Sequence, residues 1–212
     1  MAKKVKITAT VTNDLNNDRR MIRTCKALTD AGYEVLLVGR KRKQSKPIKE
    51  QPFKQLRLRN WFNKGPLFYV EHNIRLFFFM LFNRPDIIIS VDLDTILPGV
   101  LVKYLRQSKL VYDAHEYFTE VPELVDRPFV RKVWERVARF SIPKADRAYS
   151  VGTILAEILT ERYNKKFSTV RNCPEATDHN MSNSTSPPYL LYQGALNRGR
   201  CIEKTPRCGS GQ

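Results

Sequence analysis

The chain has 212 residues, of which 42% are hydrophobic and 27% charged, a composition typical of globular proteins that argues against a disordered chain. No run approaches the roughly 20 apolar residues that a membrane-spanning helix needs. Lysine and arginine outnumber acidic residues to give a net charge of +16, which favours an anionic partner. The four cysteines form no CxxC pair and have no histidine at ligand spacing, so we expect free thiols in a reducing cytosol and no metal site.

Short apolar runs alternate with segments of helical periodicity over the first 171 residues. The helical segments repeat apolar residues at i, i+3 and i+4, whereas the strand-like runs are short and continuously apolar. In chain order, the pattern predicts strands at Val5–Val11, Glu34–Gly39, Gln55–Arg59, Asp86–Val91, Lys109–Asp113, Asp146–Val151 and Phe167–Arg171, and helices at Asp18–Ala31, Leu67–Phe82, Asp94–Gln107, Arg127–Ile142 and Thr153–Tyr163.

This alternation predicts an α/β fold with a doubly wound, Rossmann-like parallel sheet in one domain, residues 1–171. Because connections between parallel strands are right-handed, the carboxyl ends of the strands gather on one rim, where ligands bind. Residues 172–188 are rich in Ser, Asn and Pro and indicate an interdomain linker. Residues 189–212 start a second domain that we expect to be truncated, because Pro206 and the closing Gly-Ser-Gly cannot continue a helix.

Two of the expected rim loops carry carboxylates. The first loop, Thr12–Asp18, contains no glycine, which argues against a GxGxxG dinucleotide site, and its Asp14 and Asp18 should cap the next helix and repel phosphate. Asp92 and Asp94 follow the isoleucine-rich strand. Two interpretations stay open: one carboxylate caps the following helix, with Asp94 at the N-cap, or Asp92 accepts hydrogen bonds from the hydroxyls of a ligand.

A histidine follows the next strand. His115 stands between Asp113 and Glu116, and flanking carboxylates can hold an imidazole in one tautomer and keep it basic near neutral pH. Such a group suits proton removal from an alcohol. A purely structural role for His115 is the alternative.

Half of the net charge lies in residues 40–59, where nine basic residues face one glutamate. The stretch favours a polyanion, either nucleic acid, anionic lipid or a phosphorylated substrate, or it is a solvated loop. Confinement to one loop with few aromatics argues against nucleic acid. The adjoining Leu67–Phe82 is either a core helix or an interfacial helix whose aromatic face enters lipid. We select as a membrane or anion patch Arg40, Lys41, Arg42, Lys43, Arg57 and Arg59.

Several short motifs, taken in this order, resemble the acceptor half of family 4 glycosyltransferases with the GT-B fold. The resemblance extends over almost the whole chain, to about Lys204. Its motifs are Asp92-Leu93-Asp94-Thr95, Asp113-Ala114-His115-Glu116, Ile142-Pro143-Lys144-Ala145-Asp146 leading to Ser150-Val151-Gly152, Arg171-Asn172-Cys173-Pro174 and Tyr192-Gln193-Gly194.

The resemblance implies transfer of a sugar from a nucleotide-sugar donor to a hydroxyl of a glycan or lipid-linked acceptor, usually with retention of configuration and without a metal or other cofactor. It also implies a role in cell-envelope polysaccharide biosynthesis. The enzyme would be located in the cytoplasm or at the inner face of the cytoplasmic membrane. His115 would be catalytic, near the reacting hydroxyl. The acceptor cleft would contain Asn13, Asp92, Asp94, Asp113 and Glu116, and the donor would approach Gly152, Thr153 and Asn172.

The chain also departs from the family pattern. The loop after the first strand is often glycine-rich in the family and close to the donor phosphates, but here it holds Asn and Asp. The family binds its donor mainly through the second domain, with basic residues and a paired-glutamate motif that this sequence lacks. We therefore expect the 212-residue chain by itself to be inactive as a transferase. The alternative is a non-catalytic basic module that binds an anionic membrane or nucleic acid.

Overall fold

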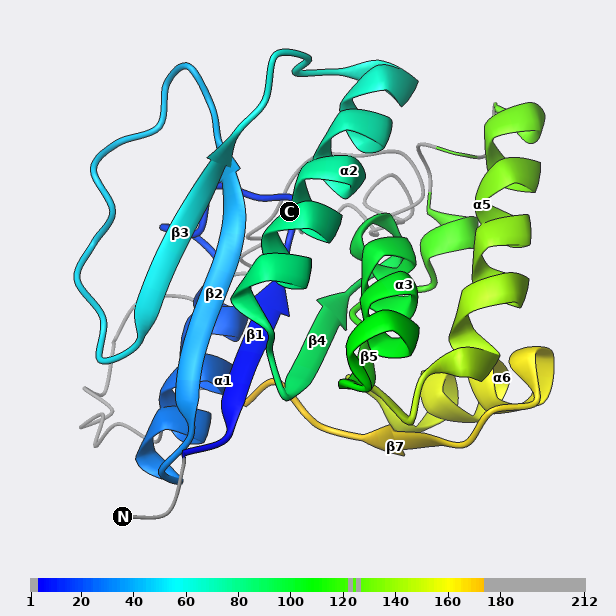
Figure 1. Ribbon diagram of the computed structural model, residues 1–212. Helices are drawn as coiled ribbons and strands as arrows, with labels where there is room; N and C mark the ends of the chain where they lie inside the picture. Colours follow the sequence, from blue (N-terminus) through cyan, green and yellow to red (C-terminus); the bar gives the residue numbers. More distant parts are fainter. Residues whose placement is uncertain (1–3, 122–123, 125–126, 174–212) are drawn as a thin grey trace, which may run out of the picture.

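The computed structural model describes residues 4–121, 124 and 127–173, and within these residues seven strands form one fully parallel sheet in the order β3-β2-β1-β4-β5-β6-β7 (Figure 1). Each strand corresponds to one of the predicted apolar runs, which confirms the doubly wound, Rossmann-like α/β fold. The strands are β1 Lys6–Thr10, β2 Glu34–Lys41, β3 Lys54–Arg59, β4 Ile87–Val91, β5 Lys109–Ala114, β6 Arg147–Ser150 and β7 Phe167–Thr169.

The helices begin and end where local chemistry sets their limits. Asp18 caps α1, because its carboxylate accepts a hydrogen bond from the Met21 N–H at 2.9 Å. Helices α2, α3 and α6 end at residues in the left-handed conformation, Arg84, Gln107 and Asn164. The bounds are α1 Arg19–Asp30, α2 Gly65–Asn83, α3 Ile96–Arg106, α5 Pro128–Ser141 and α6 Thr153–Tyr163, with short 3₁₀ turns at Leu93–Thr95, Phe118–Glu120 and Ile142–Lys144.

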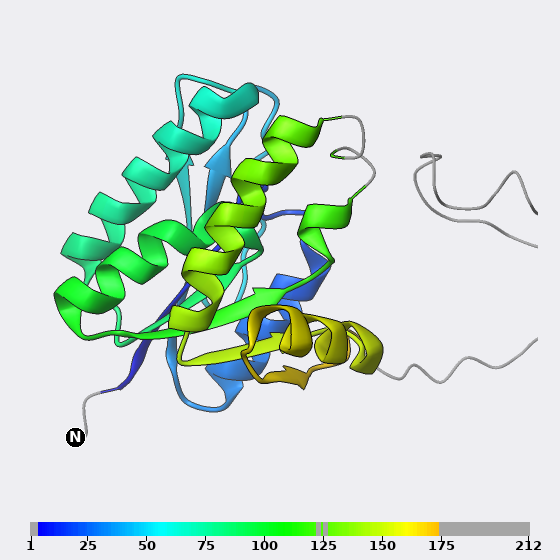
Figure 2. The ribbon, with the colours of Figure 1, turned by 90° about the vertical axis from the view of Figure 1, so that its right-hand side faces the viewer.

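Two apolar clusters attach these helices to the sheet. The larger cluster joins buried residues of α2, α3, α5 and α6 to the strands, and the smaller one joins α1 to β1, β2 and β4. Figures 1 and 2 show α2 and α3 side by side on one face of the sheet and α1 on the opposite face. The predicted covering of both faces is therefore present, because burial of the continuously apolar strands requires helices on each side.

Helix α2 has one buried side and one exposed apolar side. Phe68, His72, Leu76 and Met80 recur every fourth residue and are all buried. The other side exposes Leu67, Val70, Ile74, Phe78 and Phe82. The helix thus packs in the core, and it also displays the apolar surface that the interfacial alternative requires. No helix among the described residues is long and apolar enough to cross a bilayer.

Three local expectations are wrong. Of the two interpretations of the β4 loop, the helix cap is wrong: the N-cap of α3 is Thr95, without a side-chain hydrogen bond, because Asp94 accepts from the Thr12 hydroxyl and Asp92 from the His115 N–H, in the loops after β1 and β5. Asp14 does not cap α1 but pairs with Arg57. The last strand ends at Thr169 instead of Arg171. From Pro174 onward, the proposed linker and the start of the second domain lie outside the described residues.

Candidate functional site

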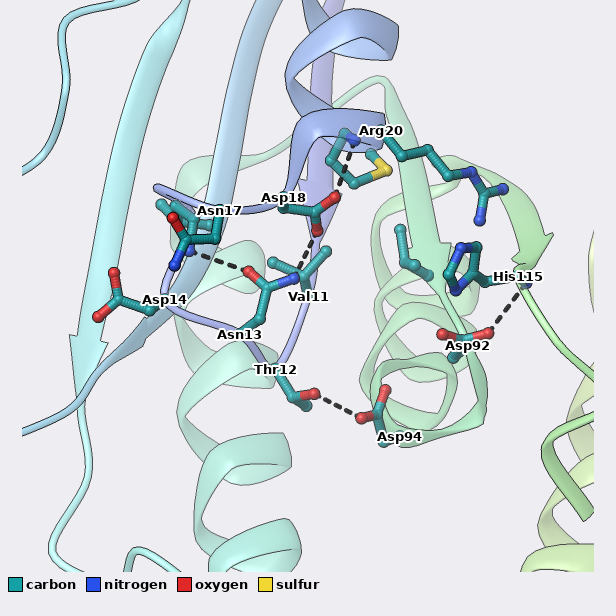
Figure 3. Close-up of a pocket in the computed structure, with 13 residues that line it drawn as sticks. Val11, Thr12, Asn13, Asp14, Asn17, Asp18, Arg20, Asp92, Asp94 and His115 are labelled. Carbon is teal, nitrogen blue, oxygen red and sulfur yellow. Dashed lines mark hydrogen bonds between the residues drawn. The ribbon is translucent and has the colours of Figure 1, made fainter. Parts of the chain in front are cut away.

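A cavity of about 290 Å³ opens at the carboxyl ends of β1, β4 and β5 (Figure 3). We call it the rim pocket. The chain runs from β1 outward to β2 and β3 on one side, and β4 and β5 continue on the other, so β1 and β4 meet at the topological switch point of the sheet. The pocket is lined by Val11, Thr12, Asn13, Asp14, Leu15, Asn17, Asp18, Arg20, Met21, Val91, Asp92, Asp94 and His115.

The loop between β1 and α1 is held by its own polar groups and by a glycine of β2. The Asn13 side chain accepts a hydrogen bond from the Leu15 N–H at 2.9 Å and donates one to Asp18. The Arg40 N–H donates to the Asn13 carbonyl at 2.9 Å. A Cβ on Gly39 would lie 2.6 Å from that carbonyl oxygen and would also collide with the Leu15 side chain. Only glycine therefore permits this approach of β2 to the loop.

Two residues of the pocket have strained backbones. Leu15 has a φ of 76°, and Asp92 has a φ of 56° with a ψ of 177°, a region that normally requires glycine. The other non-glycine residues with positive φ among the described residues are the three helix C-caps, where this conformation is ordinary. Strain of this kind costs about 1–3 kcal/mol per residue and is concentrated at functional sites.

The two carboxyl groups of the β4 loop both have raised pKa values. Burial raises the pKa of Asp92 well above its usual range, and the neighbouring Asp94 raises it further, while the His115 N–H donates to its Oδ1 at 3.0 Å and opposes the shift. Burial also raises the pKa of Asp94 to about 6, although the Thr12 hydroxyl donates to Asp94 at 2.6 Å. Asp92 therefore keeps its proton to a higher pH than an ordinary carboxyl group and can both donate and accept hydrogen bonds, whereas Asp94 ionises as the pH rises through about 6 and then only accepts them.

His115 lies at the pocket directly after β5, as the sequence predicted. Its backbone is fixed by Asp92, and Figure 3 shows its imidazole beside that carboxylate. Among the described residues no side chain hydrogen-bonds the ring, so both ring nitrogens are available to a ligand. The structure therefore brings together four of the six residues selected for catalysis and acceptor binding: Asn13, Asp92, Asp94 and His115.

Asp113 and Glu116 do not line the rim pocket. Asp113 is fully buried, pairs with Arg20 and accepts a hydrogen bond from the Tyr149 hydroxyl at 2.8 Å. Burial raises the pKa of Asp113, and Arg20 opposes this shift. The carboxylate thereby orients Arg20, which the sequence did not single out and which does line the pocket. Glu116 is exposed outside it.

The three residues selected as close to a donor follow β6 and β7. Gly152 has an ordinary extended backbone, and a Cβ there would meet no atom within 4 Å, so the space beside it is open in this chain. Thr153 is the exposed first residue of α6, and the exposed Asn172 accepts a hydrogen bond from Arg23. None of them lines the rim pocket.

The selected basic patch separates into groups with different surroundings. Arg40, Arg42 and Lys43 line a second cavity of about 810 Å³, which we call the basic pocket. Arg57 lies beneath this surface, paired with Asp14 at 2.6 Å. Lys41 and Arg59 are register partners on β2 and β3 and do not line the cavity. The basic pocket is completed by Asp14, Asn16, Asn17, Gln44, Lys46, Lys49, Asn63 and Lys64.

The sequence also did not single out a buried histidine next to the rim loops. His72 of α2 is within 3.4 Å of the Val11 carbonyl through Nε2 and within 3.3 Å of the Asn60 side chain through Nδ1. Burial lowers the pKa of His72 to about 4, so the ring is neutral and supports the end of β1 from below. Within the described ranges, no three His, Cys, Asp or Glu side chains converge in an arrangement that could hold a metal ion.

Comparison with solved structures shows the same fold in several other proteins. Sucrose-phosphate synthase from Thermosynechococcus elongatus superposes with a TM-score of 0.59 at 14% identity, covering 79% of this chain and 48% of that one. A glycosyltransferase from Rickettsia africae gives 0.53 at 12% identity, with 80% and 43% covered. The S. aureus MnaA-UDP co-structure gives 0.53 at 16% identity, with 78% and 43% covered. The chain thus spans about half the length of these proteins.

Sequence comparison identifies the family. A search among curated proteins finds none that matches this chain. The model of Glycosyltransferase Family 4 matches residues 18–177, which include α1, the rim loops after β4 and β5, and the motifs up to Asn172. This match extends over most of the chain, and the sheet topology agrees with it. The chain therefore belongs to Glycosyltransferase Family 4.

Proposed function

We propose that this domain is the acceptor-binding side of a transferase that moves a sugar from a nucleotide-sugar donor to a hydroxyl of a glycan or lipid-linked acceptor. The observation that carries the proposal is the rim pocket, whose hydroxyl, amide, carboxyl and imidazole groups converge on one cavity at the switch point of the sheet. Such a set of groups suits a polyhydroxylated ligand, because each sugar hydroxyl both donates and accepts hydrogen bonds.

His115 provides the chemistry in this proposal. The acceptor hydroxyl attacks the anomeric carbon of the donor sugar on the face from which the nucleoside diphosphate departs, so that the configuration is retained. The new C–O bond replaces the bond to the diphosphate, and the hydroxyl proton passes to the His115 imidazole. Asp92 fixes the backbone of His115 at 3.0 Å and, with Asp94, orients the acceptor. A fold neighbour solved with UDP supports a nucleotide-linked donor. Sugar transfer requires donor-binding groups other than the residues of the rim pocket. We therefore expect this chain by itself to show no turnover.

The test is acceptor binding by the 212-residue protein. We expect oligosaccharides selected on a glycan array to bind, and His115→Ala and Asp92→Asn each to weaken binding at least about tenfold, because each variant removes a group that faces the ligand. Saturation-transfer NMR and calorimetry measure the affinity. Lys132→Ala serves as a control, since this residue is exposed on α5 away from the pocket.

Two results would contradict the proposal in different ways. Glycan binding that is insensitive to both pocket variants would move the acceptor site away from the rim pocket. Radiolabelled transfer from UDP-glucose, UDP-N-acetylglucosamine or GDP-mannose by the wild-type chain would refute the expected inactivity, and loss of that transfer in His115→Ala would still support the catalytic assignment.

The exposed side of α2 supports a second proposal, peripheral attachment to an anionic membrane. Its apolar residues are 51–74% exposed and follow one side of the helix, where Glu71 and Arg75 pair with each other, and Leu101, Tyr104 and Leu105 of α3 are exposed as well. Trp61 and Phe62 are exposed in the segment before α2, where the Trp61 ring lies 4.9 Å from the Arg75 guanidinium. Lys64, directly before the helix, belongs to the basic pocket. Apolar side chains next to a basic pocket are typical of interfacial helices.

Vesicle binding tests the membrane proposal. We expect Ile74→Glu/Phe78→Glu to reduce co-sedimentation with phosphatidylglycerol vesicles at least about tenfold, because two apolar side chains no longer enter the interface. The matched control is Ile154→Glu/Ile158→Glu, which places the same charges at the same spacing on the exposed side of α6. Equal loss in both variants, or no loss in either, would reject α2 as the membrane-facing element.

A further inference from the structure

The basic pocket is a preformed cavity of positive charge adjoining the rim pocket. Asp14 and Asn17 line both cavities and form their common wall. At about 810 Å³ the basic pocket is large enough for a small phosphorylated group. Its cationic residues are Arg40, Arg42, Lys43, Lys46, Lys49 and Lys64.

The one carboxylate in the lining does not neutralise these cations. The Asp14 carboxylate pairs with Arg57 at 2.6 Å and also accepts a hydrogen bond from the Ser45 hydroxyl. No ion pair joins any of the six lining cations to a carboxylate in the described part of the chain. The pocket therefore carries an uncompensated positive charge that favours an anion.

The loop that carries the cations is held in place by hydrogen bonds. The Arg57 guanidinium donates to the carbonyls of Asp14 at 2.8 Å and Lys46 at 2.6 Å. Asn16 donates to the Pro47 carbonyl at 2.8 Å and accepts from the Lys49 N–H at 3.1 Å. These contacts tie the β2–β3 loop to the β1–α1 loop. A loop that is fixed in this way differs from the freely solvated loop that the sequence left open.

Arg40 lines this pocket and has a partly unsatisfied guanidinium group. Its guanidinium lies 4.2 Å from the centre of the Phe68 ring, and its Nε–H is buried without an acceptor among the described residues. Burial lowers the pKa of Arg40, and Arg42 lowers it further. An anion bound beside Arg40 and Arg42 would offset both the cost of burying the Arg40 charge and its repulsion by Arg42.

We propose that the basic pocket binds a phosphate or diphosphate group carried by the acceptor, whose sugar hydroxyl enters the adjoining rim pocket. This inference rests on the proposed function, which supplies the acceptor. Asp14 and Asn17 line both cavities, so the two cavities are neighbours, as binding of one ligand across both requires. The acceptor is then an anionic sugar, and specificity depends on its phosphate as well as its hydroxyls.

The test compares ligands with and without phosphate. Calorimetry of the 212-residue protein is expected to show binding of inorganic pyrophosphate, and binding of glucose 1-phosphate at least tenfold tighter than that of glucose. In Arg42→Gln/Lys43→Gln/Lys46→Gln this preference should disappear, and pyrophosphate binding should weaken at least tenfold. The control Lys132→Gln/Arg136→Gln/Lys166→Gln removes the same charge from exposed positions outside the pocket and should bind like wild type.

The outcomes separate this site from the proposed function. Equal affinity for glucose and glucose 1-phosphate, or equal weakening in both triple variants, would refute the phosphate site and leave glycan binding at the rim pocket intact. Pyrophosphate binding without any glycan binding would support the anion site and refute the acceptor assignment. Thermal melts of both triple variants establish that they fold.

Additional arms identify where the phosphate comes from. If it belongs to a lipid, phosphatidylglycerol vesicles should compete with pyrophosphate in the wild type, whereas Ile74→Glu/Phe78→Glu should retain pyrophosphate binding. If it belongs to a free phosphorylated sugar, the vesicles should not compete. Single-stranded RNA that binds tightly and salt-sensitively, while pyrophosphate does not bind at all, would reassign the pocket to nucleic acid and overturn the proposal.

Discussion

Arg20→Met is expected to lower the free energy of unfolding by about 3–5 kcal/mol at neutral pH, because it leaves the Asp113 carboxylate without its cation. Asp113 is fully buried and the Arg20 side chain is 10% exposed, so water compensates little for the loss. Within the described part of the chain, only the Tyr149 hydroxyl, at 2.8 Å, still donates to the carboxylate. Urea denaturation followed by circular dichroism measures the effect.

The double variant Arg20→Met/Asp113→Asn is the control, and it should recover most of the lost stability because no unpaired charge remains. The deficit of Arg20→Met should also shrink as the pH falls. Burial already raises the pKa of Asp113, so the folded variant would bind a proton before the unfolded chain does, and the penalty is present above the unfolded pKa and absent below it. A single variant no less stable than the double variant would show that Arg20 contributes packing alone.

Asp94→Asn is expected to stabilise the protein by up to about 3 kcal/mol above pH 6 and to have no effect near pH 3.5. Burial raises the pKa of Asp94 to about 6, whereas an unfolded aspartate titrates near its ordinary value. Between these two values the folded state retains a proton that the unfolded state has released, so stability falls as the pH rises through this window. Above pH 6 the full penalty is present, and asparagine removes it.

Thermal melts between pH 3.5 and pH 8 would measure the Asp94→Asn effect. Asparagine can still accept the hydrogen bond from Thr12, so the fold of the pocket should persist. We expect the stabilised variant to bind acceptor glycans more weakly, as at sites where function opposes stability. A stability difference that is independent of pH would show that Asp94 does not titrate in this window.

Sequence periodicity predicted the sheet well, because most strands are short apolar runs and the helices repeat apolar residues at helical spacing. The β4 strand is an example. Its three successive isoleucines point alternately to both faces of the sheet, so both faces must be covered to bury them. Its rim loop was likewise predictable, because parallel strands place their carboxyl ends together. His115, Asp92, Asp94 and Asn13 follow from topology and residue type.

The features that could not be predicted from the sequence are ion pairs between residues far apart in the chain. Arg20 and Asp113 are 93 residues apart, and Asp14 and Arg57 are 43 apart, so no local pattern links them. Asp113 looked like a cleft residue because it stands two residues before His115, but its buried carboxylate is occupied by Arg20 and by the Tyr149 hydroxyl, which come from distant parts of the sequence. The strained conformation of Asp92 is invisible in sequence as well, because a residue other than glycine gives no signal of positive φ.

The close approach of β2 to the β1–α1 loop at Gly39 also limits how this site can evolve. Any larger residue at Gly39 would displace the Asn13 carbonyl and the Leu15 side chain together, and both belong to the rim pocket. Mutational drift can therefore alter what the rim pocket binds through the side chains of the loops, while the backbone beneath them stays constant. For directed evolution, the productive library positions are the exposed lining residues of the β2–β3 loop, and Gly39 is a position to leave unchanged.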